Sequence, residues 1–130
     1  MKKMLVLLQV VLIASLSLVA NNVSAEGNKT VTHVVMVWLK NPGNVADRNA
    51  FIKASEKLNA LPGIVSRHVG VVKASDRAIV DDTFDVAVTV TMESEAALQA
   101  YLKNPKHKKV LKEEIKPLTN RVVAYDFISQ

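Results

Sequence analysis

The 130-residue sequence contains no cysteine, so the folded domain has no disulfide bonds and cannot carry a lipid anchor on cysteine. It also lacks a glycine-rich phosphate loop, a Gly-x-Ser-x-Gly elbow and an HxxxH metal motif. No sequence motif therefore points to nucleotide binding, serine hydrolysis or a zinc site. Without disulfides, the domain must be held by its core, and the chain is long enough for one such core.

Long apolar runs are confined to the N-terminus. Lys2 and Lys3 precede a mostly apolar run, Met4–Leu18, and Val23-Ser24-Ala25 follows as a suitable cleavage site. A membrane-spanning helix needs about 20 consecutive apolar residues, whereas one glutamine and two serines interrupt this run. The pattern therefore predicts a cleaved secretory signal peptide and no stable membrane anchor.

These features divide the chain into a signal peptide, residues 1–25, and a single domain, residues 26–130, that is exported to the periplasm or released. The formal net charge is +5, and five lysines lie between Lys103 and Lys112. No aromatic residues alternate with these lysines, and two glutamates follow directly. This pattern is typical of a solvated helix face, so we expect no nucleic-acid partner.

The apolar periodicity predicts four strands and two helices, the second of them broken by Asn104-Pro105. The first strand is apolar almost throughout, as expected for a strand covered on both faces. The third alternates cleanly, with Asp85 on its polar side. The order β-α-β-β-α-β predicts an α+β, ferredoxin-like protomer with helices on one face of an antiparallel sheet. The strands are expected at residues 31–39, 64–72, 84–92 and 121–128, and the helical segments at 45–61, 95–103 and 105–118.

One face of the first strand has no predicted helix to cover it. Val34, Met36 and Trp38 alternate with the residues that face the helices. An exposed apolar face of this kind is unfavourable in water, so we expect it to pack against a second copy of the chain as a homodimer.

The break at Asn104-Pro105 brings two reactive side chains to one joint. Asn104 can cap a helix that has proline at its first position, which places His107 in the first turn and Tyr101 near the end of the preceding helix. The positive end of a helix and burial both favour a neutral imidazole, which suits a general base. A structural histidine, bonded to a carbonyl or to Tyr101, is the alternative.

Inward-facing residues of the strands and the first helix could line a ligand pocket or fill an ordinary core. A domain of this size can leave only a modest cavity, so its ligand would be small and apolar or phenolic. His33, His68 and His107 are not expected to meet, so we expect no metal site and no cofactor. The candidate ligand-binding residues are His33, Val35, Val37, Phe51, Val88 and Val90.

Five short motifs occur in a familiar order: His33-Val34-Val35-Met36-Val37, Leu61-Pro62-Gly63-Ile64, Ala100-Tyr101-Leu102, Asn104-Pro105-Lys106-His107 and Tyr125-Asp126-Phe127. Through them the chain, from about Thr32 to Phe127, resembles the stress-responsive dimeric A/B barrel family. The resemblance implies two ferredoxin-like protomers that join their sheets into a dimeric α/β barrel. It also implies a small apolar cavity between the sheet and the helices.

One branch of that family, the plant polyketide cyclases, uses a histidine as general base and a tyrosine to orient the substrate in an aldol-type ring closure. The resemblance places these roles on His107 and Tyr101, and that of a further cavity histidine on His33. This chain has Val86 and Ala54 where the branch has a histidine and a tyrosine. Two functions follow as hypotheses: a homodimeric small-molecule-binding or stress-response module, or a cofactor-free acid/base enzyme.

Overall fold

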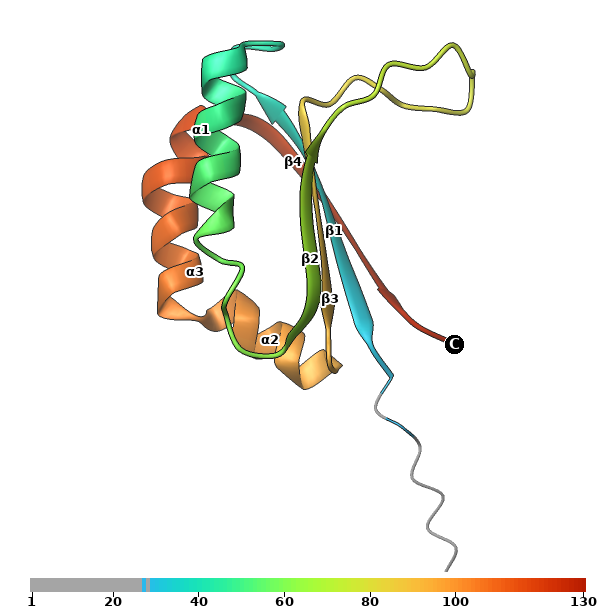
Figure 1. The fold of residues 1–130 in the computed structure, drawn as a ribbon, viewed down its shortest axis with the longest axis vertical. Coiled ribbons are helices and arrows are strands. Elements are labelled where there is room, and N and C mark those ends of the chain that lie inside the picture. The colour runs from blue at the N-terminus through green and yellow to red at the C-terminus, as the bar shows by residue number, and fades with distance from the viewer. Residues whose placement is uncertain (1–26, 28) are drawn as a thin grey trace, which may run out of the picture.

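The computed structural model describes residue 27 and residues 29–130, so the predicted signal peptide lies outside the described residues. A four-stranded sheet forms one layer and the helices form a second layer on one of its faces (Figure 1). No helix in the described part is long and apolar enough to cross a membrane. The elements are β1 (Val31–Leu39), α1 (Val45–Glu56), β2 (Ile64–Val71), β3 (Val86–Met92), α2 (Glu95–Lys103), α3 (Pro105–Val110), a π-helix (Leu111–Ile115), a short 3-10 helix (Lys116–Leu118) and β4 (Thr119–Ile128).

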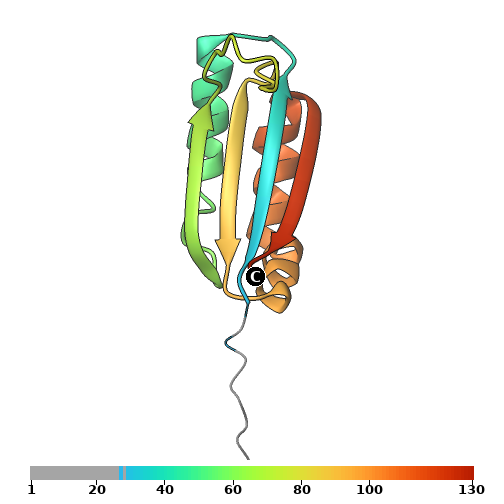
Figure 2. The ribbon, with the colours of Figure 1, turned by 90° about the vertical axis from the view of Figure 1, so that its right-hand side faces the viewer.

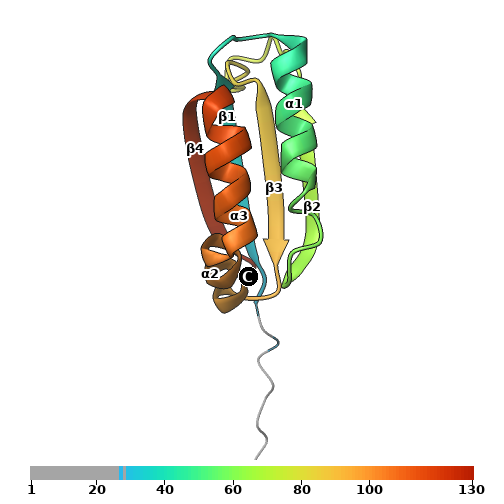
Figure 3. The same cartoon turned by 90° about the vertical axis from the view of Figure 1, so that its left-hand side faces the viewer.

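The sheet has the strand order β2-β3-β1-β4, and every neighbouring pair is antiparallel (Figure 2). β1 is a central strand with a neighbour on each side, but helices cover only one of its faces (Figure 3), whereas its apolar sequence predicted cover on both. Helices α1, α2 and α3 all lie in front of the same sheet face (Figure 3). The predicted α+β class and the ferredoxin-like βαββαβ order are thus confirmed.

Side-chain caps set the helix starts that the sequence predicted. Asn44 Oδ1 accepts a hydrogen bond from the Asp47 amide at 2.9 Å, and Asn104 Oδ1 accepts one from the Lys106 amide at 2.9 Å. The first helix is shorter than expected, because α1 ends at Glu56 and tight turns continue the chain. In these turns the Leu58 amide donates to the Ser55 carbonyl, which keeps Leu58 buried without a further helical turn.

Asp85 does not lie on the polar side of a strand, as the alternation suggested. β3 begins only at Val86, and Asp85 is buried with 6% of its surface exposed. Its carboxylate accepts hydrogen bonds from the amides of Leu39 at 2.8 Å and Gly43 at 2.7 Å. The prediction failed because Asp85 serves the end of β1 and the turn after it, a contact that strand periodicity cannot reveal.

The uncovered sheet face is broader than the sequence indicated. In the register of β1 with β4, Tyr125 lies beside Val34 and Phe127 beside Thr32. Tyr125 is 61% exposed and Phe127 is 55% exposed. Trp38 is better covered: the Arg121 guanidinium lies 4.3 Å from the centroid of its ring, and its indole N–H donates to Thr83. β4 therefore supplies the most exposed aromatic surface of this face.

This face leads to a prediction about assembly. Replacing Tyr125 by lysine should weaken a homodimer by at least about tenfold, because a charge would be buried at an apolar contact. Analytical ultracentrifugation across a dilution series measures the effect. Val45→Lys is the matched control, since Val45 is 57% exposed but begins α1 on the other side of the molecule. A wild-type protein that sediments as a monomer at micromolar concentration would show that this face has no such role.

Candidate functional site

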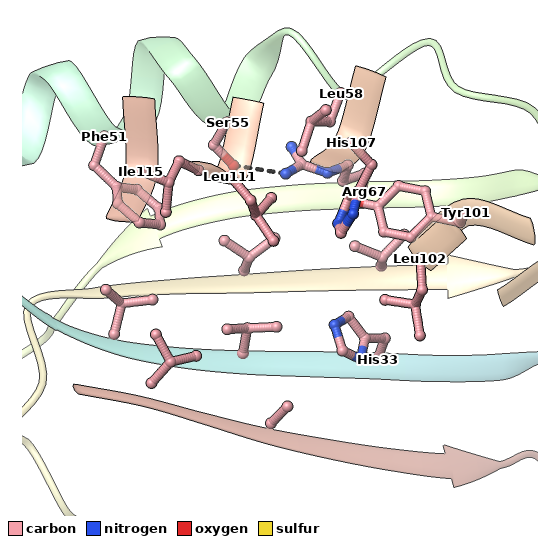
Figure 4. Close-up of a pocket in the computed structure, with 16 residues that line it drawn as sticks. His33, Phe51, Ser55, Leu58, Arg67, Tyr101, Leu102, His107, Leu111 and Ile115 are labelled. Atoms are coloured by element: carbon pink, nitrogen blue, oxygen red, sulfur yellow. Dashed lines mark hydrogen bonds between the residues drawn. The ribbon is translucent and has the colours of Figure 1, made fainter. Parts of the chain in front are cut away.

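A cavity of about 280 Å³ lies between the sheet and the helices. Its wall contains both residues predicted for catalysis and all six predicted for ligand binding (Figure 4). Their roles stay predictions, but the fold does bring them to one space. The eight are His33, Val35, Val37, Phe51, Val88, Val90, Tyr101 and His107.

His107 and Tyr101 meet where α2 gives way to α3. Their ring centroids are 4.5 Å apart and the rings are tilted by 54°. Both side chains are buried, with 7% of His107 and 3% of Tyr101 exposed. Within the described residues, His107 Nδ1 has no hydrogen-bond partner. The backbone of Leu102 also acts on the ring, so a structural histidine stays the alternative to a ligand-binding one.

The surroundings of His107 favour its neutral form. Burial lowers the pKa of the imidazole, and the neighbouring His33 and Arg67 lower it further. An interaction with the backbone of Leu102 opposes the shift without reversing it. At neutral pH the ring therefore offers a lone pair, as a general base requires.

His33 is oriented by a carboxylate from the neighbouring strand. It stands opposite Asp126 in the register of β1 with β4, and its Nδ1 lies 2.5 Å from Asp126 Oδ1. A carboxylate only accepts hydrogen bonds, so Nδ1 is the donor. Asp126 thus fixes the orientation of the His33 ring in the cavity wall.

Arg67 is a cavity residue that the sequence did not reveal. A bulge between Ile64 and Ser66 shifts the register of β2 and sets Arg67 opposite Val90, on the helix-covered face. Its Nη1 donates to Asn59 Oδ1 at 2.7 Å and its Nη2 to Ser55 Oγ at 2.6 Å. Its Nε is buried and has no partner among the described residues.

The bulge explains why Arg67 was missed. Strict alternation from Ile64, which packs against the core, would turn Arg67 outward, since the two are three positions apart. One signal was available: Arg67 alternates along the strand with Val69 and Val71, so the three residues are expected on the same sheet face. Six further lining residues were also not predicted: Ser55, Leu58, Leu102, Ile115, Val122 and Ala124.

His68 lies away from the cavity. It pairs with Thr89 on the opposite sheet face from Arg67 and Val90. In the part of the chain that the structure describes, no group of three histidine or acidic side chains is placed to hold a metal ion. His33 and His107 thus share the cavity without the third histidine.

The lowered pKa of His107 predicts how stability depends on pH. The unfolded chain takes up a proton near the ordinary histidine pKa of about 6.5, before the folded chain does. The contribution of His107 to the free energy of unfolding is therefore fully present above that pH, and it is lost as the pH falls through the pKa of His107 in the folded chain. Urea unfolding between about pH 7.5 and 5 should show a steeper loss for wild type than for His107→Gln.

The outward-facing His68 provides the control for this measurement. His68→Gln should keep the steep wild-type slope, because His68 is exposed on β2, the edge strand farthest from the aromatic surface of β4. Equal slopes for wild type and His107→Gln would show that burial of His107 does not destabilise its charged form.

The fold and the cavity together define a class: a small α+β domain of ferredoxin-like plan with a cavity under a single helical layer. The family model of the stress responsive A/B barrel domain (Dabb) matches residues 31–129, and the chain belongs to this family. The resemblance drawn from the sequence motifs is therefore confirmed. A comparison with curated proteins found no match.

Solved structures show the same fold at low sequence identity. A dimeric ferredoxin-like protein of unknown function from Thermobifida fusca is 22% identical, with 78% of this chain and 92% of that chain covered and a TM-score of 0.63. A Dabb family protein from Mesorhizobium loti is 17% identical, with 79% and 99% covered and a TM-score of 0.66. The hydroxynitrile lyase from Passiflora edulis is 23% identical, with 78% and 94% covered and a TM-score of 0.65.

Proposed function

We propose that the chain is an exported homodimer that binds a small molecule in this cavity. The observation that carries the proposal is a pair of buried nitrogens, His107 Nδ1 and Arg67 Nε, that have no partner among the described residues. An unsatisfied buried polar group costs about 1–3 kcal/mol. Both nitrogens belong to residues that line the cavity, and a small shift of either side chain would bring its nitrogen to a ligand or a water molecule there.

The assembly part of the proposal rests on the uncovered sheet face and on the relatives. The proteins from Thermobifida fusca and Bacteroides fragilis with this fold are described as dimeric. In this chain the uncovered sheet face carries exposed aromatic side chains on β4. A twofold dimer would cover the face of both copies with a single contact.

Export rests on the N-terminal sequence pattern. Two lysines, an apolar run and small residues before Glu26 predict cleavage after Ala25. The intact mass of the protein recovered from the medium or periplasm should correspond to a chain that begins at Glu26. A recovered protein that still contains residues 1–25 would contradict the proposal of a cleaved signal.

A second candidate function is acid/base catalysis without a cofactor. The contact of the neutral His107 with Tyr101 favours it, and one protein of this fold, from Passiflora edulis, is a hydroxynitrile lyase. In such a reaction His107 would take a proton from the substrate and return it later, while Tyr101 would orient the substrate oxygen. Activity should then rise with pH through the pKa of His107, because only the neutral ring is a base.

Histidine NMR can test whether the cavity takes a ligand. Titration with small aromatic probes, such as benzoate, benzamide and phenol, should shift the ring resonances of His33 and His107, which line the cavity. The resonances of His68 should stay in place, since His68 lies on the outer sheet face. If the resonances of His33 and His107 do not shift with any probe up to millimolar concentration, the proposal of ligand binding is contradicted.

The proposal of an enzyme needs a separate test. Turnover of a hydroxynitrile probe by the wild-type protein should disappear in His107→Gln.

A further inference from the structure

We infer that the ligand is a small monocarboxylate with an apolar body, whose carboxylate is bound by Arg67. This inference rests on the proposed function, since it names the class of molecule that the cavity binds. It gives Arg67 the role of a ligand-binding residue. The argument uses the hydrogen bonds of Arg67, the distribution of polarity in the cavity, and its opening to solvent.

Arg67 is a half-buried cation without a counter-ion. Both terminal nitrogens donate to neutral oxygens, those of Asn59 and Ser55. Across residues 29–130, no carboxylate forms a salt bridge with it; the ion pairs there are His33–Asp126 and Lys57–Glu114. A guanidinium withdrawn from water is stabilised by an anion that also accepts its hydrogen bonds. A ligand carboxylate beside the guanidinium would supply the charge, and it would accept hydrogen bonds from N–H groups that the two neutral oxygens leave unused.

The cavity has one polar end and one apolar end. Arg67, Tyr101 and His107 lie together at one end, whereas Phe51 and Ile115 lie at the other (Figure 4). A cavity of about 150 Å³ holds benzene, so one of about 280 Å³ has room for an aryl or branched alkyl group with a short chain. In such a ligand the carboxylate would lie at the polar end of the cavity and the apolar body at the apolar end.

The opening of the cavity lies beside a row of lysines. Leu111 and Val122 line the cavity but are 37% and 51% exposed, so the wall is open between the π-helix and β4. A groove of about 610 Å³ shares both residues with the cavity, and three lysines also line it. Positive charge at an entrance attracts anions and speeds their association. The lysines are Lys108, Lys112 and Lys116.

This groove revises how the lysine-rich segment is understood. From the sequence, these lysines were interpreted as a solvated helix face. They are exposed, but they also border the route to the only arginine in the cavity wall. The lysines of the groove and Arg67 are separate features, and both favour a negatively charged ligand.

The test compares acids with their uncharged amides on the wild-type protein. Benzoate, phenylacetate and 3-methylbutanoate are titrated beside the matching amides by calorimetry at about pH 7.5, where His107 is neutral. Each acid should bind at least about tenfold more tightly than its amide, since hydrogen bonds to charged groups are the stronger ones. Added salt should weaken binding of the acids and leave the amides unchanged.

Two arginine variants locate the carboxylate. Arg67→Met keeps the length of the side chain and removes its charge, so the acids should lose at least about tenfold in affinity while the amides do not. Arg77→Met removes the same charge from an exposed loop and should change neither. Thermal melts establish whether Arg67→Met is folded, and the acid–amide comparison on wild type decides the question if it is not.

The outcomes separate this inference from the function on which it rests. Amides that bind as tightly as the acids, or an Arg67→Met protein with wild-type affinity for the acids, would overturn the carboxylate inference and leave ligand binding in place. If none of the acids and none of the amides binds at millimolar concentration, both are wrong. If the preference for the acids is kept in Arg77→Met and lost in Arg67→Met, the result supports both ligand binding and the carboxylate inference.

Discussion

The structure depends on a sheet that has helices for only one of its two faces. Alternate residues of β1 face opposite sides, so Val35 lines the cavity while Val34, next to it, lies on the uncovered face. The helical layer leaves a cavity on one side, and the bare aromatic surface of β4 is left on the other. The proposed ligand binding and the proposed assembly thus use the two sides of the same strands. A shift of β1 in such a dimer would move residues of the cavity wall directly.

Local chemistry made much of the fold and part of the site predictable. Asn104 followed by proline sets the start of α3, and that start alone places His107 against Tyr101. The nearly unbroken apolar run of β1 predicted a strand, although helices cover only one of the two faces that were expected to be covered (Figure 3). The features that were predicted correctly depend on neighbours within a few positions.

The features that escaped prediction are set by distant contacts. Arg67 reaches the cavity because one extra residue in β2 changes the side to which its strand turns it. Asp85 is buried because two amides 46 and 42 positions earlier need an acceptor. The exposed side chain of Tyr125 forms part of an apolar surface only because β4 pairs with β1 and places it beside Val34. The position of each of these three residues depends on which strands and turns pair in space. The candidate histidines could be named from their neighbours in the sequence.

The π-helix at Leu111–Ile115 gives this cavity an unusual way to change. A π turn contains one residue more than the α-helical turn it replaces, so deleting a single residue there could restore α-helical geometry. The turns on either side would keep their phase about the axis, because the π turn absorbs the extra residue locally. Only residues within the turn would change direction, and two of these, Leu111 and Ile115, line the cavity. A one-residue deletion would therefore reshape the apolar wall of the cavity without any substitution at the polar end.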